Sequence, residues 1–442
     1  MKLFAKCLAV IALVITTSMP ATAQGLIRDA EIEASIKQLA RPLLKAAGLP
    51  TGSVKFFIVN NAQPNAFVTN GRQVFIHEGL IRKLKTPEQL QAVIAHELGH
   101  ITGGHIAKRY ADFGRAKTNA MLGLLLGAIV AAAGEPGAAT GVVAGVGSSS
   151  TRAFLGHTRD QEEASDRTGL RLMMAAGINP QANVEVLEYF EGQDLMTARK
   201  RDPFVQTHPL SAERLASVRA IANANQDRQY KTDPKALYYY QRMQAKFRGF
   251  VGNPSATIRK VGTKDQSETA IYARAIAYHK MPNRKKAAIE MDKLLKLRPD
   301  DPFYNELSGQ FFLENGQTKA AIAAYSKAVS LAPKEPQILA GLGRAQLAGG
   351  QVNAALATLQ KAYARDARNG RMLRDLAAAY AQAGQPGWAN VVTAERYALV
   401  GNFGVASTHA KRAQGLLPRG SVGWNKAQDV LAAAERAGAK RL

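Results

Sequence analysis

The sequence predicts an α+β protein: a mainly helical N-terminal domain with a small antiparallel sheet, followed by an all-α array of repeated helical hairpins. Two observations indicate this fold class. Short apolar runs between positions 54 and 76 are bounded by turn residues and stand between stretches of helical periodicity. Beyond position 280, turn residues recur every 34 residues, which is the period of the tetratricopeptide repeat. The 442 residues suffice for two or three domains.

Residues 1–23 have the features of an export signal. Two lysines precede a short apolar core, Leu8 to Ile15, and Ala21-Thr-Ala23 fits the small-residue rule for a cleavage site. The apolar core is too short to span a bilayer. We therefore expect a mature chain that begins at Gln24 and resides in the bacterial periplasm. Cleavage would remove Cys7, the single cysteine, so cysteine usage does not report the redox compartment.

A helix and a small sheet are expected next. Residues 25–50 carry apolar side chains at steps of three to four and predict one amphipathic helix. The runs 54–59, 66–68 and 73–76 are candidate strands, and Asn70-Gly71 between the last two is a strong hairpin signal. We expect an antiparallel sheet whose exposed edge can hold an extended peptide by main-chain hydrogen bonds.

The stretch 92–105 contains the motif H-E-x-x-H, formed by His96, Glu97 and His100. The start at Pro87 and the apolar spacing around the motif predict a helix. Positions i and i+4 of a helix share one face, so both imidazoles can reach one metal ion, and this geometry favours Zn²⁺. Glu97 then lies beside the metal, where a carboxylate can take a proton from an activated water and pass it to a leaving amine.

Two histidines leave a catalytic zinc one protein ligand short. The best candidate lies in the charged stretch 159–169, where Glu162 and Asp166 are four residues apart on one helix face. Glu162 would bind the metal, and Asp166 would hold an imidazole N–H. Glu163 competes with Glu162, because spacing alone does not exclude it. The alternative interpretation is a charged helix N-terminus with no ligand role.

Several segments together resemble the M48 family of zinc metallopeptidases. They are His-Glu-Leu-Gly-His at 96–100, Glu-x-x-x-Asp at 162–166 and Asn65-Ala-Phe67. Thr207-His-Pro-Leu210, followed by Arg214, resembles a segment of the exported, repeat-bearing branch of the family. The resemblance covers roughly residues 30–220 as the peptidase domain.

The resemblance implies a zincin-like fold and one zinc ion per chain. The third ligand would be Glu162, with Asp166 supporting the site and Glu97 as general base. It also implies a role in quality control of outer-membrane β-barrel proteins, in which the protein degrades misfolded ones and contacts the β-barrel assembly machinery.

Two further histidines need separate interpretations. His105 follows His100 by five residues and falls on another helix face, so we expect it to pack or hydrogen-bond rather than bind metal. His208 precedes Pro209, which favours an extended conformation that can project into the cleft. A functional role for His208 rests mainly on the resemblance. It would either stabilise the oxyanion or occupy the open zinc position and silence the enzyme, and the sequence leaves both open.

Residues 116–150 are unusually apolar for an enzyme. Two apolar arms, 121–133 and 138–147, flank Gly134-Glu-Pro-Gly137, and each arm is shorter than a membrane-spanning helix. Because the segment lies between the metal helix and the third ligand, it must begin and end near the metal. We expect a lid that also contacts a membrane or an unfolded apolar substrate. Ordinary buried core helices are the alternative.

Residues 231–442 are expected to form the tetratricopeptide domain, separated from a peptidase domain at 24–230 by a polar stretch. Small residues after each turn let paired helices approach closely, and stacked pairs build one continuous core. The pattern weakens after Gly384, where Gly401-Asn402 appears at a half-period, so we expect irregular last repeats or a cap. The repeated turns are Pro282-Asn283, Gly316-Gln317, Gly350-Gln351 and Gly384-Gln385.

The chain is strongly basic, with 58 Lys and Arg against 34 Asp and Glu and a formal net charge of +24 at pH 7. No dense basic run interleaved with aromatic residues is present, so the charge favours contact with an acidic membrane surface rather than nucleic acid, unless it is only solvated surface. These features together predict a periplasmic zinc endopeptidase with a repeat domain that recruits substrates or partners. The alternative is a chaperone or adaptor with a latent protease domain. A membrane-embedded peptidase is a weaker third option.

Overall fold

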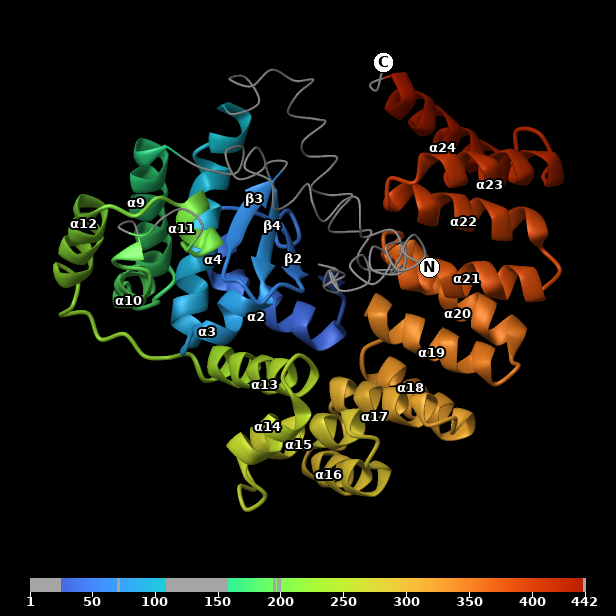
Figure 1. Cartoon of the computed structure of the whole chain (residues 1–442), viewed down its shortest axis with the longest axis horizontal. Helices are drawn as coiled ribbons and strands as arrows, with labels where there is room; N and C mark the ends of the chain where they lie inside the picture. Colours follow the sequence, from blue (N-terminus) through green and yellow to red (C-terminus); the bar gives the residue numbers. More distant parts are fainter. Residues whose placement is uncertain (1–24, 70–71, 109–157, 194–195, 197–199, 440–442) are drawn as a thin grey trace, which may run out of the picture.

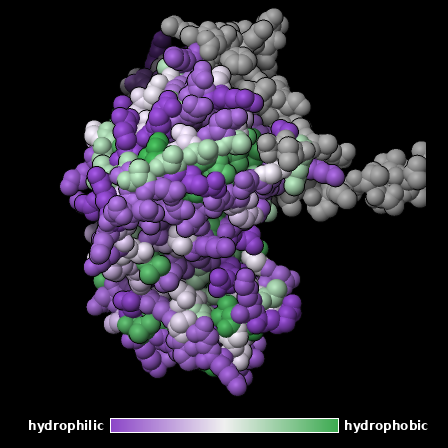
Figure 2. All heavy atoms as spheres, turned by 90° about the vertical axis from the view of Figure 1, so that its left-hand side faces the viewer, coloured by the Kyte–Doolittle hydropathy of each residue, from purple (hydrophilic) through white to green (hydrophobic). Residues whose placement is uncertain are grey.

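A computed structural model describes residues 25–69, 72–108, 158–193, 196 and 200–439. Figure 1 shows an α/β domain partly encircled by an arc of helices, which passes beneath the domain and rises along its right side. The expected export signal, the Asn70-Gly71 turn and the apolar segment 116–150 lie outside the described residues. Among the described helices, none is both long and apolar enough to cross a membrane. Figure 2 shows that the face turned to the left in Figure 1 is mainly hydrophilic, with a band of hydrophobic residues across its upper half.

The sheet has four strands in the order β1-β2-β4-β3. The expected hairpin forms, with β3 antiparallel to β4 and Phe67 opposite Phe75. The sheet as a whole is mixed rather than antiparallel, because β2 pairs with β4 in parallel. The hairpin signal predicts only the pairing of β3 with β4, which are neighbours in the sequence. It does not predict that the buried, apolar β4 lies between β2 and β3 in the sheet. The strands are β1 (Leu26–Ile27), β2 (Lys55–Val59), β3 (Ala66–Thr69) and β4 (Gln73–His77).

Helices cover the sheet and supply most of the core. The single helix expected over 25–50 is shorter than predicted: its first residues form β1, and Asp29 then caps α2 by accepting from the amides of Glu31 and Ile32. Capping by Asp satisfies N–H groups that the first helical turn leaves without a partner. The described helices of this half are α2 (Ala30–Ala46), α3 (Glu78–Lys83), α4 (Pro87–Thr102), α9 (Arg159–Ala175), α10 (Gln181–Tyr189), α11 (Pro203–Thr207) and α12 (Ala212–Asn223).

Two glycines allow α4 and α9 to approach closely. A Cβ on Gly99 would lie 2.7 Å from the backbone oxygen of Ser165, and one on Gly169 would lie 3.2 Å from the backbone of Ala95. Any larger residue at Gly99 would therefore push α9 away from α4. This close approach positions the metal-binding side chains of the two helices.

The arc consists of paired helices, as the 34-residue period predicts. Gly316, Gly350 and Gly384 occupy the turns inside successive pairs with φ of 78°, 76° and 71°. Helices continue past Gly384, but the next turn glycine, Gly401, comes half a period later, between α22 and α23, so the last part of the array is irregular as expected. The helices are α13 (Pro234–Phe250), α14 (Pro254–Val261), α15 (Glu268–Lys280), α16 (Arg284–Leu297), α17 (Pro302–Glu314), α18 (Thr318–Leu331), α19 (Pro336–Ala348), α20 (Val352–Arg365), α21 (Gly370–Gln382), α22 (Pro386–Leu399), α23 (Phe403–Leu416) and α24 (Val422–Ala439).

Helix α2 joins the two halves, since it lies inside the arc (Figure 1). Glu31, which is fully buried, forms an ion pair of 2.5 Å with Arg242 of α13 and accepts a hydrogen bond from Tyr272 of α15. Arg28, which precedes α2, forms an ion pair with Glu33 of α2. It forms a second ion pair with Asp366, which lies farther along the arc. Helix α13 also contributes apolar residues to the core of the N-terminal half. The halves are thus joined by buried charge pairs and by a shared core.

Candidate active site

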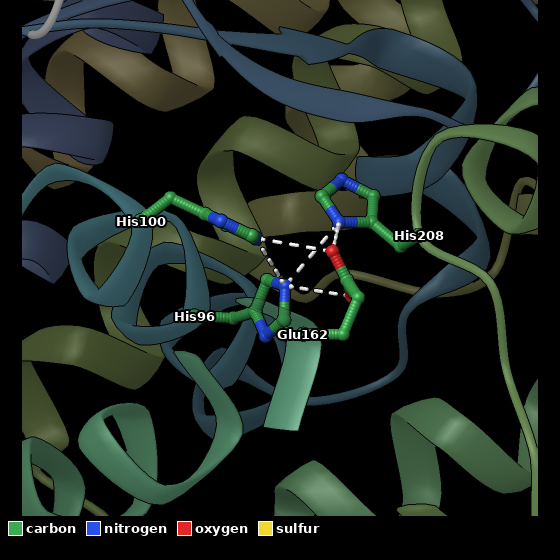
Figure 3. Close-up of side chains that lie close together, drawn as sticks. All are labelled: His96, His100, Glu162 and His208. Atoms are coloured by element: carbon green, nitrogen blue, oxygen red, sulfur yellow. Dashed lines mark hydrogen bonds and ion pairs between the residues drawn. The ribbon is translucent and has the colours of Figure 1, made fainter. Parts of the chain in front are cut away.

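Helices α4 and α9 bring the predicted ligands together. The Nε2 atoms of His96 and His100 lie 3.0 Å apart. The carboxylate of Glu162 lies 3.4 Å from His96 Nε2 and 3.3 Å from His100 Nε2. Figure 3 shows these three side chains pointing toward one centre. Glu163, the competitor, points outward and pairs with Arg167 at 3.5 Å, so the structure does not bring it to the site.

His208 completes a group of four (Figure 3). It follows the short helix α11, and its Nδ1 lies 3.1 Å from Glu162 Oε1 and 3.3 Å from His96 Nε2. The candidate ligand atoms of His96, His100, Glu162 and His208 all lie within 4.8 Å of one another, and all four residues are buried. The expectation that His208 projects into the cleft agrees with this geometry.

The hydrogen-bond pattern indicates that this group fits a cation. Asp166 Oδ1 lies 2.8 Å from His96 Nδ1, so that nitrogen donates and the Nε2 lone pair faces the centre. In the same way, His208 Nε2 donates to the carbonyl oxygen of Ala66 at 2.9 Å, which leaves the Nδ1 lone pair facing the Glu162 carboxylate. Lone pairs and a carboxylate that converge in a buried site repel one another unless a positive charge lies between them. Imidazole and carboxylate ligands in this number suit Zn²⁺.

Asp166 and Arg214 hold two of the candidate ligands, His96 and Glu162, in place. Asp166 accepts from His96 as predicted, and it also accepts from Arg214 through two guanidinium nitrogens. Arg214 Nη1 lies 2.7 Å from Glu162 Oε2. Burial acts to raise the pKa of Glu162, but Arg214 and the neighbouring histidines hold that pKa well below its usual range. Glu162 is therefore ionised and ready to bind a cation.

The sequence by itself indicates no site role for Arg214. Its only signal there is its place after the Thr-His-Pro-Leu segment, which the resemblance singled out. In the structure it is 3% exposed, although arginine is almost never buried unless it is paired. A buried, doubly paired guanidinium of this kind fixes the orientation of both carboxylates.

Glu97 lies beside the group rather than in it. Its side chain is fully buried, and within the described residues neither carboxylate oxygen accepts a hydrogen bond. The nearest recorded charge partner is His208 Nε2, 3.4 Å from Oε1. Burial raises the pKa of Glu97, against the opposing effect of His208 and His96. A carboxylate with free lone pairs and a raised pKa is suited to accept a proton.

His105 and Asn65 support the site at a distance. His105 Nδ1 lies 2.9 Å from His100 Nδ1 and 3.2 Å from Ser165 Oγ, so it is a hydrogen-bonding group outside the metal cluster, as expected. Asn65 Oδ1 accepts from Thr207 Oγ1 at 3.0 Å. This contact ties the segment that carries His208 to the start of β3.

The fold and the site define a class: a metallopeptidase domain built on an H-E-x-x-H helix, followed by tetratricopeptide repeats. The model of peptidase family M48 matches residues 27–222, and a tetratricopeptide repeat model matches residues 312–379. The chain therefore contains a domain that matches peptidase family M48, and this domain precedes the repeats.

Three relatives illustrate the similarity. The β-barrel assembly-enhancing protease of Escherichia coli K12 is 28% identical over 300 residues, which cover 67% of this chain and 60% of the relative. The protein of the same name from Yersinia pestis is 26% identical over 305 residues, which cover 67% and 62%. The mitochondrial metalloendopeptidase OMA1 of Schizosaccharomyces pombe is 26% identical over 183 residues, or 41% and 51%. The match to the two bacterial relatives thus spans about three fifths of their length.

Proposed function

We propose that this protein is a zinc-dependent endopeptidase of the bacterial periplasm, with a role in quality control of outer-membrane β-barrel proteins. The single observation that carries the proposal is the buried convergence of His96, His100 and Glu162 beside the free carboxylate of Glu97. The match of residues 27–222 to the model of peptidase family M48 supports the peptidase activity. The names of the bacterial relatives support the substrate class.

His96, His100 and Glu162 would hold the metal, and Asp166 would keep the His96 ring in the tautomer that binds it. A bound zinc ion would supply Lewis acidity toward a peptide carbonyl and lower the pKa of water. Glu97 then takes the proton of the attacking water and delivers it to the leaving amine. Its isolation from hydrogen-bond donors leaves its lone pairs available for this transfer.

The peptide substrate would lie along β3. This strand is an edge of the described sheet, and its first residue, Ala66, contacts His208 through the backbone oxygen. An extended peptide added to this edge would run past Glu97 and the metal ligands. The apolar segment 116–150 remains a candidate lid or membrane contact for unfolded substrates.

We further propose that His208 keeps the resting site closed. Its Nδ1 lies with the three ligands, in the place that a substrate carbonyl would need. Replacing His208 by Ala should therefore raise the hydrolysis of a fluorogenic peptide, by about tenfold if the closed form predominates. His409→Ala, in the repeats, is the matched control. If His208→Ala instead lowers the rate with zinc retained, His208 stabilises the oxyanion.

Metal removal tests the proposed function. The mature protein should contain about one zinc ion, as a three-ligand catalytic site predicts. It should digest an unfolded outer-membrane β-barrel protein, lose that activity on chelation and regain it with added zinc. The folded barrel is the control substrate and should resist. A protein that binds no zinc would contradict the proposal.

The chaperone or adaptor function remains the second candidate, favoured by one observation. The group of four includes His208, and a four-coordinate metal held by all four residues would leave no position for a substrate. If both the parent protein and His208→Ala bind zinc but neither digests the unfolded barrel protein, the result would support this candidate.

A further inference from the structure

A cavity of about 750 Å³ separates the peptidase half from the inner side of the arc. One wall consists of β1 and the start of α2, including Ile27 and Arg28. The opposite wall is built from α13, α17, α19 and α21. Its size falls within the range of ligand sites in proteins. Neither the peptidase chemistry nor the repeat packing requires this space.

Some of the basic side chains that line the cavity form ion pairs with carboxylates, and others do not. Arg28 and Lys246 are paired with carboxylates, at 2.5 Å from Asp366 and 2.8 Å from Asp29. Arg368 and Arg371 also line the cavity, yet within the described residues their guanidinium groups form neither a hydrogen bond nor an ion pair. The free positive charge is therefore concentrated at the α21 wall.

Arg344 also lines the cavity, and Arg374 lies next to it. Arg344 contacts Asp375 at 2.6 Å, and Arg374 pairs with the same carboxylate at 2.8 Å, so one acid serves two bases. Partial burial and the charges of Arg344 and Arg374 lower the pKa of Arg371, while Asp375 and Glu314 act to raise it. The N-terminal end of α21, a helix of 13 residues, adds a favourable dipole for an anion.

The acidic residues of the cavity cancel this charge only in part. Glu314 pairs with His279 at 2.6 Å, and its charge also acts on Arg371. Burial raises the pKa of Glu306 to about 7, so its negative charge is reduced near neutral pH. Within the described residues, Arg368 and Arg371 thus face the cavity without a carboxylate in ion-pair contact, and Arg344 shares Asp375 with Arg374.

We infer that this cavity binds an acidic, extended segment of a partner protein. Arg368 and Arg371 would pair with its carboxylates, and apolar side chains such as Ile27, Phe250 and Leu313 would contact the residues between them. Strand β1, an edge of the described sheet, offers its backbone to an extended chain. The inference rests on the proposed recruiting role of the repeats and specifies both the site and the chemistry of the partner.

The test is direct binding to the full mature chain carrying Glu97→Gln, which prevents cleavage of the probe. The probe is a fluorescent 12-residue peptide that alternates Glu with Leu, acetylated and amidated at its ends. The comparison peptide replaces each Glu by Gln. The Glu peptide should bind at least about tenfold more tightly, and its affinity should fall as salt is raised.

The variants locate the binding. Arg371→Glu should weaken binding of the Glu peptide by about tenfold or more, and Arg371→Lys by less, since lysine keeps the charge but lacks the planar fork. Arg419→Glu, an equal charge change on an exposed residue of the α23–α24 turn, should leave affinity unchanged. Equal loss in Arg371→Glu and Arg419→Glu, or no loss in Arg371→Glu, would overturn the inference.

Folding does not confound this test. Arg371 is the second residue of α21 and is exposed, and a glutamate in a first helical turn is favoured by the helix dipole. Unchanged thermal unfolding would confirm this. If the chain with Glu97 intact cleaves its substrate but the Glu peptide does not bind the Glu97→Gln chain, only the cavity inference is refuted. Peptide binding without proteolysis would refute only the peptidase proposal.

Discussion

Replacing Glu97 by Gln is expected to reduce kcat/KM for peptide hydrolysis by about 10²–10⁴-fold, the usual contribution of a general base. The amide is isosteric but does not accept the proton of the attacking water. Because Glu97 lies outside the group His96, His100, Glu162 and His208, zinc content should stay unchanged. Steady-state kinetics and metal analysis on the same preparation check both parts.

Glu163→Gln is the matched control for this variant. It makes the same chemical change on a neighbouring element, but its side chain is 43% exposed and pairs with Arg167, away from the metal ligands. Its kinetics should equal those of the parent protein. If Glu97→Gln kept full biological activity in cells, the peptidase proposal would fail, and the adaptor function would take its place.

Replacing Arg242 by Met is expected to have the largest effect on stability. Arg242 is 2% exposed and pairs with Glu31 and Asp301, each at 2.5 Å, while its guanidinium lies 4.0 Å from the Tyr304 ring centre. Loss of one partner from a buried ion pair costs about 3–5 kcal/mol. Without Arg242, Glu31 would keep Lys246 as its only ion-pair partner within the described residues. Amide hydrogen exchange in α2 and α13 should accelerate by roughly a hundredfold to several thousandfold.

Lys235→Met is the control on the same helix. Lys235 is exposed and forms no side-chain ion pair within the described residues, so the change should alter stability by less than about 0.5 kcal/mol. Comparable destabilisation by both variants would mean that loss of positive charge, rather than the buried contact between the halves, is responsible. If Arg242→Met accelerated amide exchange only in the repeats and not in α2, the proposed contact of Arg242 with α2 would not be what stabilises the protein.

Local patterns in the sequence determined a large part of this structure. The H-E-x-x-H spacing places His96 and His100 on one helix face, and Pro87 marks where that helix begins. The four-residue spacing of Glu162 and Asp166 on α9 makes them candidates, while the choice of Glu162 over Glu163 rests on the family resemblance. The hairpin and the 34-residue helix pairs also follow from short-range signals. In each case the physical cause acts within one element or between neighbours in the chain.

Only the tertiary structure decided the remainder. His208 joins a cluster that includes Glu162, 46 positions earlier, and His96, 112 positions earlier, and Arg214 bonds a carboxylate 48 positions away. Glu31 meets Arg242 across 211 positions. The parallel pairing of β2 with β4 and the cavity behind α21 are likewise products of distant packing. Such contacts form because buried faces exclude water and buried charges require partners, and no periodicity or turn signal in the chain records which distant partner will be met.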